Sequence, residues 1–306
     1  MKKLLSVTLA LALVLALAAC GGGSAQSNPA PATDAPAADT PAPATQAPAD
    51  EPTEPRASGS NLETEPTEPP ASTASDILVQ STVEPGKLHM STNAAFPPYE
   101  MIADDGSFEG IDVEIAGAIA DRLGLELVVD DMDFDAALLA AQNGQSDIVM
   151  AGVSVTEERQ QVMEFSDTYA TAVQVIIVKE GSAIQSADDL ASAAMIGTQR
   201  ATTGYLYCSD DYGEDHVTAF NTGALAIQAL LNDQVDCVVI DDMPAREYVK
   251  ANPGLVILET EYVTEEYAIG MAKGNTELVD AVNYALSILR GNGTLQAIID
   301  KYITAE

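Results

Sequence analysis

The chain has 306 residues, and its 47 Asp and Glu against 13 Lys and Arg give a formal net charge of −34 and a pI near 4.1. This balance excludes a nucleic-acid-binding role, which requires clustered Lys and Arg to displace counterions from phosphates. With two His and three Cys, the sequence also argues against a His-rich metal site, a disulfide-stapled scaffold and a His-based catalytic triad. The hydrophobic content of 47% suffices for one or two packed domains.

Residues 1–20 have the pattern of a secretory signal peptide. Two Lys residues precede an apolar run from Leu4 to Ala19, and the segment ends in Leu17-Ala-Ala-Cys20, followed by three glycines. A transmembrane anchor is the alternative, but a bilayer span needs about 20 apolar residues. The run that ends at Cys20 resembles the bacterial lipobox, which implies that this Cys is lipidated and becomes the mature N-terminus. Because one acyl chain holds a protein only weakly, the resemblance implies several chains, palmitate among them.

Residues 21–75 have the composition of a disordered tether. They contain 11 of the 16 prolines, interleaved with Ala, Thr, Asp and Glu in repeated Ala-Pro, Glu-Pro and Thr-Glu-Pro units. Such a segment buries too little apolar surface to offset the entropy of ordering it. Residues 76–306 hold 10 Lys and Arg against 39 Asp and Glu, a net charge of −29, so the acidity belongs mainly to the part expected to fold.

From residue 87 onward, short β-like runs alternate with helical patterns. Strand, helix, strand, helix and strand are expected in turn over 88–92, 112–123, 125–129, 133–143 and 147–151. The first helix is amphipathic, and Gly124 follows it as a C-terminal stop. This alternation is typical of βαβ units and predicts an α/β protein with a mostly parallel sheet and helices on both of its faces.

The alternation starts again after a strand expected at 174–178. Helices are expected at 186–192, from 202 and at 222–231, and strands at 194–197, 217–221 and 236–240. These elements predict a second α/β lobe.

The last stretch does not predict a third domain. It contains a strand at 267–272 and helices at 276–289 and 294–302, and about 40 residues make a poor independent core. We expect this stretch to return to the first lobe, so that two strands cross between the lobes near 171–174 and 260–265. The expected lobe 1 is then 76–172 with 264–306, and the expected lobe 2 is 173–263.

Several motifs follow one another along residues 87–302. They are Lys87–Glu100 with its Phe96-Pro-Pro-Tyr-Glu100 end, Gly110-Ile-Asp-Val-Glu114, Phe134, Asp147–Arg159 and Phe165–Tyr169. In this order and spacing they resemble the polar amino-acid-binding proteins of ABC importers, which are extracytoplasmic solute-binding proteins of the type II periplasmic-binding fold. The resemblance implies two lobes joined by two crossover strands, each a sheet flanked by helices, with a ligand held between them and no cofactor.

The residues around Arg159 point to an anion site on physical grounds. Thr156 is a natural helix N-cap after a strand, and a capping box would place Glu or Gln where the chain has Arg159. A cation there faces the positive end of the helix dipole, at a cost of about 0.3 to 1 kcal/mol. A carboxylate bound by Arg159 and by N–H groups near Ser154 would offset that cost. The alternative is an exposed Arg159 paired with Glu157 or Glu158.

A free amino acid also carries an ammonium group, which calls for a buried acid. The strand expected at 236–240 leads to Asp241, at the edge where open α/β sheets bind ligands. By resemblance Asp241 takes the ammonium group, although Asp242 competes with it for this role or for that of a helix N-cap. The resemblance also gives ligand contacts to Thr202 and Thr203, with ordinary capping by Thr202 an equal alternative.

The resemblance names further residues for the ligand's side chain. Phe96 would stack on it, and Phe134 would form the opposite wall or, equally, belong to the core. Asn93, Gln199 and Arg200 match side-chain-facing positions, and Asn93 departs from the more common acid there, so a polar amino acid is expected without a named one. The full predicted ligand-binding set is Asn93, Phe96, Phe134, Ala151, Gly152, Ser154, Arg159, Gln199, Thr202, Thr203 and Asp241.

The two Cys residues beyond Cys20 leave two alternatives open. Cys208 and Cys237 form a disulfide, which export would permit, or they are separate buried thiols, which the apolar run around Cys237 favours.

Three functions are compatible with these features. The first is a lipid-anchored protein that captures an amino acid and delivers it to the permease subunits of an ABC importer. The second is a dehydratase-like enzyme, but the named set has no His base and no activated nucleophile. The third is a sensory ectodomain, which would need a separate partner because no membrane or kinase segment follows Tyr302. We expect the first, without metal or catalysis, as a monomer outside the bacterial cell membrane.

Overall fold

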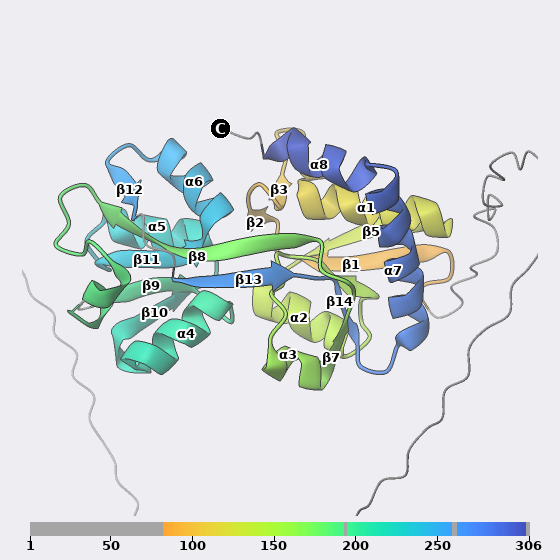
Figure 1. Cartoon of the computed structure of the whole chain (residues 1–306), viewed down its shortest axis with the longest axis horizontal. Coiled ribbons are helices and arrows are strands. Elements are labelled where there is room, and N and C mark those ends of the chain that lie inside the picture. Colours follow the sequence, from red (N-terminus) through yellow and green to blue (C-terminus); the bar gives the residue numbers. More distant parts are fainter. Residues whose placement is uncertain (1–81, 193–194, 259–261, 304–306) are drawn as a thin grey trace, which may run out of the picture. The chain divides into compact units, whose positions relative to one another are not determined.

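The computed structural model describes residues 82–192, 195–258 and 262–303, which form two lobes, each built around a β-sheet (Figure 1). The signal peptide and the whole tether expected from the sequence, residues 1–20 and 21–75, lie outside the described residues. No helix within the described part is long and apolar enough to cross a membrane.

Five strands form the sheet of lobe 1. In spatial order they are β5 (Glu126–Asp131), β1 (Lys87–Thr92), β6 (Ile148–Val149), β14 (Gly270–Ala272) and β7 (Met163–Phe165). β1 is parallel to both of its neighbours, whereas β14 is antiparallel to both of its neighbours. The sheet thus combines strands from the two ends of the described chain.

Helices cover both faces of this sheet, and successive apolar residues along a strand pack against the helices of opposite faces. Ile148 and Met150 face α1 (Ile111–Leu123), α7 (Thr276–Gly291) and α8 (Thr294–Tyr302), while Val149 and Ala151 face α2 (Phe134–Gln142). The short helix α3 (Glu157–Val162) precedes β7. α1 ends at Gly124, which has the left-handed φ of 70° expected of a C-terminal stop.

Lobe 1 also contains a small antiparallel sheet that was not predicted from the sequence. Its strands are β2 (Ala95–Phe96), β3 (Glu100–Ile102) and β4 (Phe108–Glu109). The Phe96-Pro-Pro-Tyr-Glu100 segment turns the chain back on itself, so that Phe96 and Glu100 become partners across the β2–β3 hairpin. Strands of two or three residues are too short for a clear alternation in the sequence.

Lobe 2 contains the second sheet. Its strands, in spatial order, are β10 (Val217–Phe220), β9 (Ile196–Gln199), β11 (Cys237–Asp241), β8 (Ala170–Lys179) and β12 (Leu255–Ile257). β10, β9 and β11 are parallel, and β8 is antiparallel to β11 and β12. The helices are α4 (Thr203–Tyr212), α5 (Gly223–Leu231), α6 (Asp242–Ala251) and the 3₁₀ turns η1 (Ala187–Ser192) and η2 (Glu214–His216).

The expected α/β architecture of helix-flanked sheets is present, but three details differ from the sequence prediction. The sheets are mixed rather than mostly parallel, because β8, β12 and β14 run against their neighbours. The helix expected at 186–192 is a 3₁₀ helix. The single strand expected at 267–272 is two strands, since the chain leaves one sheet after Tyr267 and joins the other at Gly270.

Two strands cross between the lobes. β8 and β13 (Val263–Tyr267) lie side by side and antiparallel, from Ala170 opposite Tyr267 to Gln174 opposite Val263 (Figure 1). Both crossings expected from the sequence are therefore parts of one hydrogen-bonded ribbon, and residues 259–261 at the start of the second crossing lie outside the described chain.

The core of lobe 2 is also divided by its sheet. Val238 and Ile240 of β11 pack toward α5 and α6, and Cys237 and Val239 pack with Cys208 of α4. Both thiols are free, and burial raises the pKa of each to about 12. The structure therefore shows separate buried thiols rather than a disulfide.

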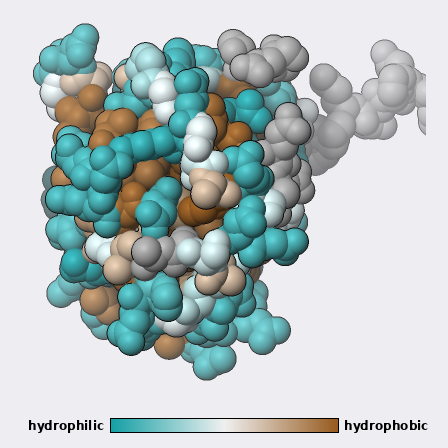
Figure 2. Space-filling view, turned by 90° about the vertical axis from the view of Figure 1, so that its left-hand side faces the viewer, coloured by the Kyte–Doolittle hydropathy of each residue, from teal (hydrophilic) through white to brown (hydrophobic). Residues whose placement is uncertain are grey.

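Figure 2 shows the surface of the molecule at the lobe 2 end, where hydrophilic residues cover most of the surface and apolar residues are visible between them.

The turn into α1 gives a testable packing constraint. Gly110 has a φ of +130°, and a Cβ atom there would lie 2.2 Å from the carbonyl oxygen of Tyr99. Gly106 has a φ of +85° with nothing within 4 Å of its Cβ position, so Gly106→Ala is a matched control for backbone strain. We predict that Gly110→Ala lowers the free energy of unfolding by about 2 kcal/mol or more beyond Gly106→Ala, measured by urea denaturation. Equal losses would contradict this packing.

Candidate functional site

One pocket between the lobes collects all eleven residues of the predicted ligand-binding set. Lobe 1 contributes side chains or backbone from the ends of β1 and β6, the β2 strand, and the first turns of α2 and α3. Lobe 2 contributes the ends of β9 and β11 and the start of α4. The lining residues are Asn93, Phe96, Glu100, Phe134, Ala151, Gly152, Ser154, Arg159, Gln199, Thr202, Thr203 and Asp241.

This placement follows from the topology of the sheets. β1, β6, β9 and β11 have their carboxyl ends at the boundary between the lobes, and residues at or shortly after the end of each strand line the pocket. Ligands of open α/β sheets bind at this edge because loops and helix N-termini with free N–H groups gather there.

Arg159 is buried in the wall of lobe 1. Its side chain is 8% exposed, its guanidinium lies 5.6 Å from the centre of the Phe134 ring, and Nη1 donates a hydrogen bond to the Ser154 carbonyl at 2.8 Å. Thr156 caps α3 by accepting from the Arg159 amide at 3.2 Å, as the sequence predicts. The alternative of an exposed Arg159 paired with a surface acid is therefore wrong.

The Arg159 guanidinium also reaches lobe 2. Nη2 donates to the carbonyl of Ala201 at 3.0 Å, and Ala201 has a left-handed φ of 61°, uncommon for a residue other than glycine. Burial lowers the pKa of Arg159, and the negative charges of Glu265 and Asp241 oppose that shift. Carbonyl groups alone leave a guanidinium without an anionic partner, so the group retains a strong preference for a carboxylate.

Asp241 is the last residue of β11 and precedes α6. Its side chain makes no capping bond to α6 and instead accepts a hydrogen bond from the hydroxyl of Tyr267. Burial, and then the negative charge of Glu265, raise the pKa of Asp241 to about 7. Asp242 does not line the pocket and accepts from the Val173 amide at 3.4 Å, so the structure distinguishes the two neighbouring acids.

The start of α4 combines capping with pocket lining. Thr202 accepts from the Tyr205 amide at 3.3 Å and donates to the Gln199 carbonyl at 2.8 Å, so the capping alternative holds for this residue. Thr203 donates from Oγ1 to Glu265 at 2.9 Å. The first turn of α4, whose backbone N–H groups have no partners within the helix, therefore lies at the pocket. The Thr203 hydroxyl beside it is held in place by its bond to Glu265.

Glu265 of β13 was not predicted, and it ties the two lobes together behind the pocket. One of its oxygens, Oε2, accepts from Ser154 at 3.1 Å, from Gln174 at 3.0 Å and from Thr203 at 2.9 Å. The sequence carried a signal for this. Along β13, Glu265 lies two residues from both Val263 and Tyr267, and it therefore shares their inward face.

Glu100 also lines the pocket and was not predicted as a site residue, although it closes the Phe96-Pro-Pro-Tyr-Glu100 motif. Its side chain is fully buried beside the carboxyl group of Asp112, which shares a hydrogen-bonding interaction with it, and no N–H group among the described residues donates to it. Burial, and then the negative charge of Asp112, raise the pKa of Glu100 well above its usual value. Its spacing from Phe96 across a Pro-Pro turn would have indicated that both side chains face one side.

Asp112 supports the pocket from behind. Both of its oxygens accept from the hydroxyl of Tyr169 at 2.8 Å, and Oδ2 also accepts from the amide of Gly152, which lines the pocket, at 2.9 Å. Burial raises the pKa of Asp112 to about 6, while these hydrogen bonds oppose the shift.

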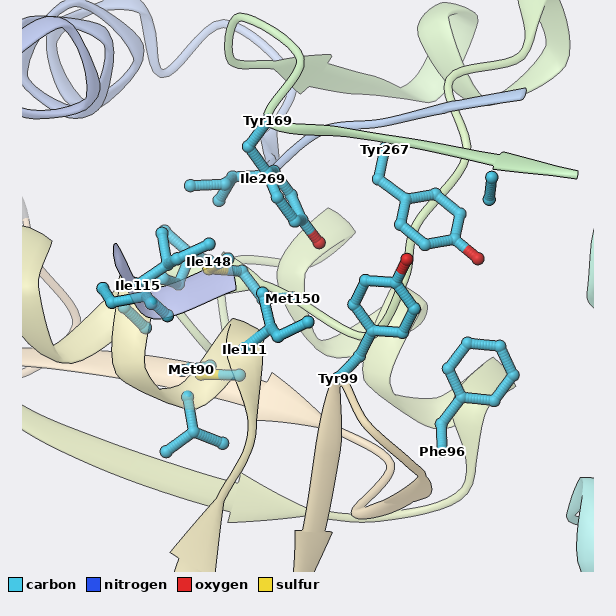
Figure 3. Close-up of a cluster of buried hydrophobic side chains, with 14 of the residues drawn as sticks. Met90, Phe96, Tyr99, Ile111, Ile115, Ile148, Met150, Tyr169, Tyr267 and Ile269 are labelled. Carbon is cyan, nitrogen blue, oxygen red and sulfur yellow. The ribbon is translucent and has the colours of Figure 1, made fainter. Parts of the chain in front are cut away.

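Aromatic rings form the wall of lobe 1 (Figure 3). Phe96 stacks near Tyr99, with ring centres 6.0 Å apart, and Tyr99 meets Tyr267 edge to face at 5.1 Å. Phe134 lies under the Arg159 guanidinium and packs into the core behind β6 as well, so it fits both of its predicted roles. Of these rings, Phe96 and Phe134 line the pocket, and Tyr99 and Tyr267 pack behind Phe96.

Two amides meet across the far end of the pocket. Gln199 donates from Nε2 to Asn93 Oδ1 at 3.1 Å and to the Asn221 carbonyl at 3.3 Å, and Asn93 donates to the Met132 carbonyl at 2.8 Å. Gln199 Oε1 is buried and has no donor among the described residues.

The charges around the pocket are unbalanced. Arg159 is the one buried Lys or Arg side chain among the described residues, whereas four carboxyl groups are buried around it: Glu100, Asp112, Asp241 and Glu265. No group of three or more metal-ligating side chains with a suitable arrangement occurs within the described ranges. The pocket is thus a place for a cationic or zwitterionic organic molecule.

Comparison with known proteins agrees with this geometry. Residues 88–305 match the model of the bacterial extracellular solute-binding proteins, family 3. A probable histidine-binding protein of Neisseria gonorrhoeae is 34% identical over 72% of this chain and 85% of its own length, and an arginine-binding extracellular protein of Bacillus subtilis is 34% identical over 72% and 87%.

Solved structures with the same two-lobe fold are equally similar. The arginine-, lysine-, histidine-binding protein ArtJ of Geobacillus stearothermophilus has a TM-score of 0.68 and 35% identity over 72% of this chain and 96% of its own. An ancestral arginine-binding protein bound to glutamine has a TM-score of 0.68 and 37% identity over 72% and 100%. The fold class is thus the expected type II periplasmic-binding fold, and the chain belongs to the bacterial extracellular solute-binding proteins of family 3.

Proposed function

We propose that the protein captures a cationic amino acid between its lobes and delivers it to the permease of an ABC importer. The family assignment supports a binding protein rather than an enzyme or a sensor. The single observation that carries the choice of ligand is the surplus of buried carboxyl groups over the one buried guanidinium at the pocket.

The α-carboxylate and α-ammonium groups of the ligand are assigned to opposite lobes. Arg159 of lobe 1, together with Ser154 and the first turn of α4, has the donors that a carboxylate needs. Asp241 of lobe 2 is the acid for the ammonium group, since a nearby cation favours the ionised form of a carboxyl whose pKa burial has raised to about 7. A zwitterion therefore satisfies both groups at once only when the lobes close.

The ligand's side chain is assigned to the part of the pocket lined by Glu100. Three buried acceptor oxygens of the pocket lining, two on Glu100 and Oε1 on Gln199, have no N–H donor among the described residues. A buried polar atom without a partner costs about 1 to 3 kcal/mol, more if it is charged. A guanidinium supplies five N–H donors and one positive charge, and the Phe96 ring can stack on its plane. Because burial raises the pKa of Glu100, the neighbouring positive charge of a guanidinium would favour its ionised form, whereas a neutral amide such as glutamine would not; we therefore favour an arginine-like ligand.

The test compares L-arginine with its neutral isostere L-citrulline by titration calorimetry. We predict that the wild type binds arginine at least about 100-fold more tightly than citrulline. The reason is that the cationic side chain of arginine can form a buried ion pair with Glu100, whereas the neutral side chain of citrulline cannot. Glu100→Gln should reduce arginine affinity by about 10- to 100-fold and leave citrulline nearly unchanged.

The matched control is Glu109→Gln, which removes the same charge from an exposed position of the same small sheet. It should leave both affinities unchanged. If the wild type binds neither ligand but binds another amino acid, or if Glu100→Gln leaves arginine affinity intact, the proposed side-chain assignment is wrong.

We further propose that the protein is held outside the cell by lipid on Cys20. The signal pattern of 1–20 and the Pro-rich composition of 21–75 support cleavage before Cys20 and a tether that spaces the lobes from the membrane. Residues 76–172 with 264–306 and residues 173–263 are the proposed lobes. A monomer fits this arrangement, because each chain supplies a whole pocket.

The anchor is tested by fractionation of cells that produce Cys20→Ser. We expect this variant to be unlipidated and to appear in the soluble extracellular or periplasmic fraction, with Ser24→Ala as a control that stays in the membrane fraction. Retention of Cys20→Ser in membranes after an alkaline wash would instead indicate an uncleaved membrane anchor.

A further inference from the structure

Tyr248 of lobe 2 reaches across to the small sheet of lobe 1. It lies on α6, and its hydroxyl donates a hydrogen bond to the carbonyl oxygen of Ala95 in β2 at 3.0 Å. Tyr248 does not line the ligand pocket. Its bond is therefore a contact between the lobes that no ligand atom takes part in.

The Tyr248 ring is held firmly on its own side. It is 9% exposed and packs against the start of α5, where a Cβ atom on Gly223 would lie 3.0 Å from its ring. Burial also raises the pKa of its hydroxyl, so the group remains a neutral donor at physiological pH. The donor is thus fixed in lobe 2, and the acceptor moves with lobe 1.

The acceptor belongs to the part of lobe 1 that touches the ligand's side chain. Ala95 directly precedes Phe96, and Phe96 faces Glu100 across the β2–β3 hairpin. Both residues line the pocket. Strands of two or three residues hold a hairpin weakly by themselves, so an added bond to its edge restricts its position.

We propose that Tyr248 is a positioning residue that holds the β2–β3 hairpin when the lobes close, and thereby sets Phe96 and Glu100 against the ligand's side chain. This inference rests on the proposed function, because it assigns the side chain to the Glu100 end of the pocket. Opening the lobes breaks the bond to Ala95 and frees the hairpin, so ligand release and loss of side-chain recognition are one event.

Tyr248→Phe removes the hydroxyl and keeps the ring. Tyr212→Phe is the matched control, since the Tyr212 hydroxyl also donates to a backbone carbonyl, that of Ala187 at 3.4 Å, but within lobe 2. L-arginine and L-citrulline are the probes, titrated into the full mature chain by calorimetry, with thermal unfolding of each ligand-free variant as the check on folding.

We expect Tyr248→Phe to weaken arginine binding about three- to ten-fold, the usual value of one hydrogen bond, and citrulline binding by less. The loss should appear in the dissociation rate, and Tyr212→Phe should match the wild type. The ratio of the two affinities is independent of any change in stability, so it remains decisive if Tyr248→Phe also unfolds at a lower temperature.

Unchanged arginine affinity in Tyr248→Phe would overturn the inference, and so would equal losses for both ligands, which would indicate a general contact between the lobes without positioning of Glu100. Neither result bears on the proposed function, which is tested separately by the preference of the wild type for arginine over citrulline and by Glu100→Gln.

Discussion

The structure depends on the burial of ionisable groups at the boundary between two lobes. Four carboxyl groups and one guanidinium are buried in or beside a single pocket between the lobes. Desolvating an unpaired charge costs several kcal/mol, and the one cation, Arg159, does not balance the acids. Burial raises the pKa values of Glu100, Asp112 and Asp241 for the same reason. A ligand that brings two positive groups and one carboxylate would reduce this formal surplus of negative charge by one, which couples closure to recognition.

The fold supplies this boundary through its chain topology. Both connections between the lobes belong to one antiparallel ribbon, β8 with β13, so the lobes can bend relative to each other while their sheets stay intact. Glu265 on this ribbon accepts hydrogen bonds from Ser154 of lobe 1 and Thr203 of lobe 2, which places a shared acceptor at the hinge side of the pocket. Differential contacts of the ligand with the two lobes then shift the population toward the closed form.

The sequence allowed the pocket to be predicted far better than the elements that complete it. Arg159 and Asp241 could be placed from local patterns, because a helix-capping position and the end of a buried strand can be identified in the sequence, whereas Asn93 was assigned through the family resemblance. The β2–β3 hairpin was missed because its strands are too short to show alternation, and Glu100 was missed with it. The mixed strand directions come from the antiparallel pairings of β8, β12 and β14, and the contacts of Glu265 with both lobes come from the pairing of β8 with β13; local patterns encode neither of these long-range pairings.

The central claim is that buried carboxyl groups oppose closure until a cation arrives, and small-angle scattering of residues 76–306 tests it most directly. The pKa of Asp241 is raised to about 7 in the closed form, and a carboxyl whose pKa is higher in the closed form favours closure as the pH falls through that value. We predict a larger radius of gyration for the ligand-free protein at pH 8, a smaller one on saturation with arginine, and a shift toward the smaller value at pH 5 without ligand. Ligand-free curves at pH 8 and pH 5 that both coincide with the arginine-saturated curve would contradict the account.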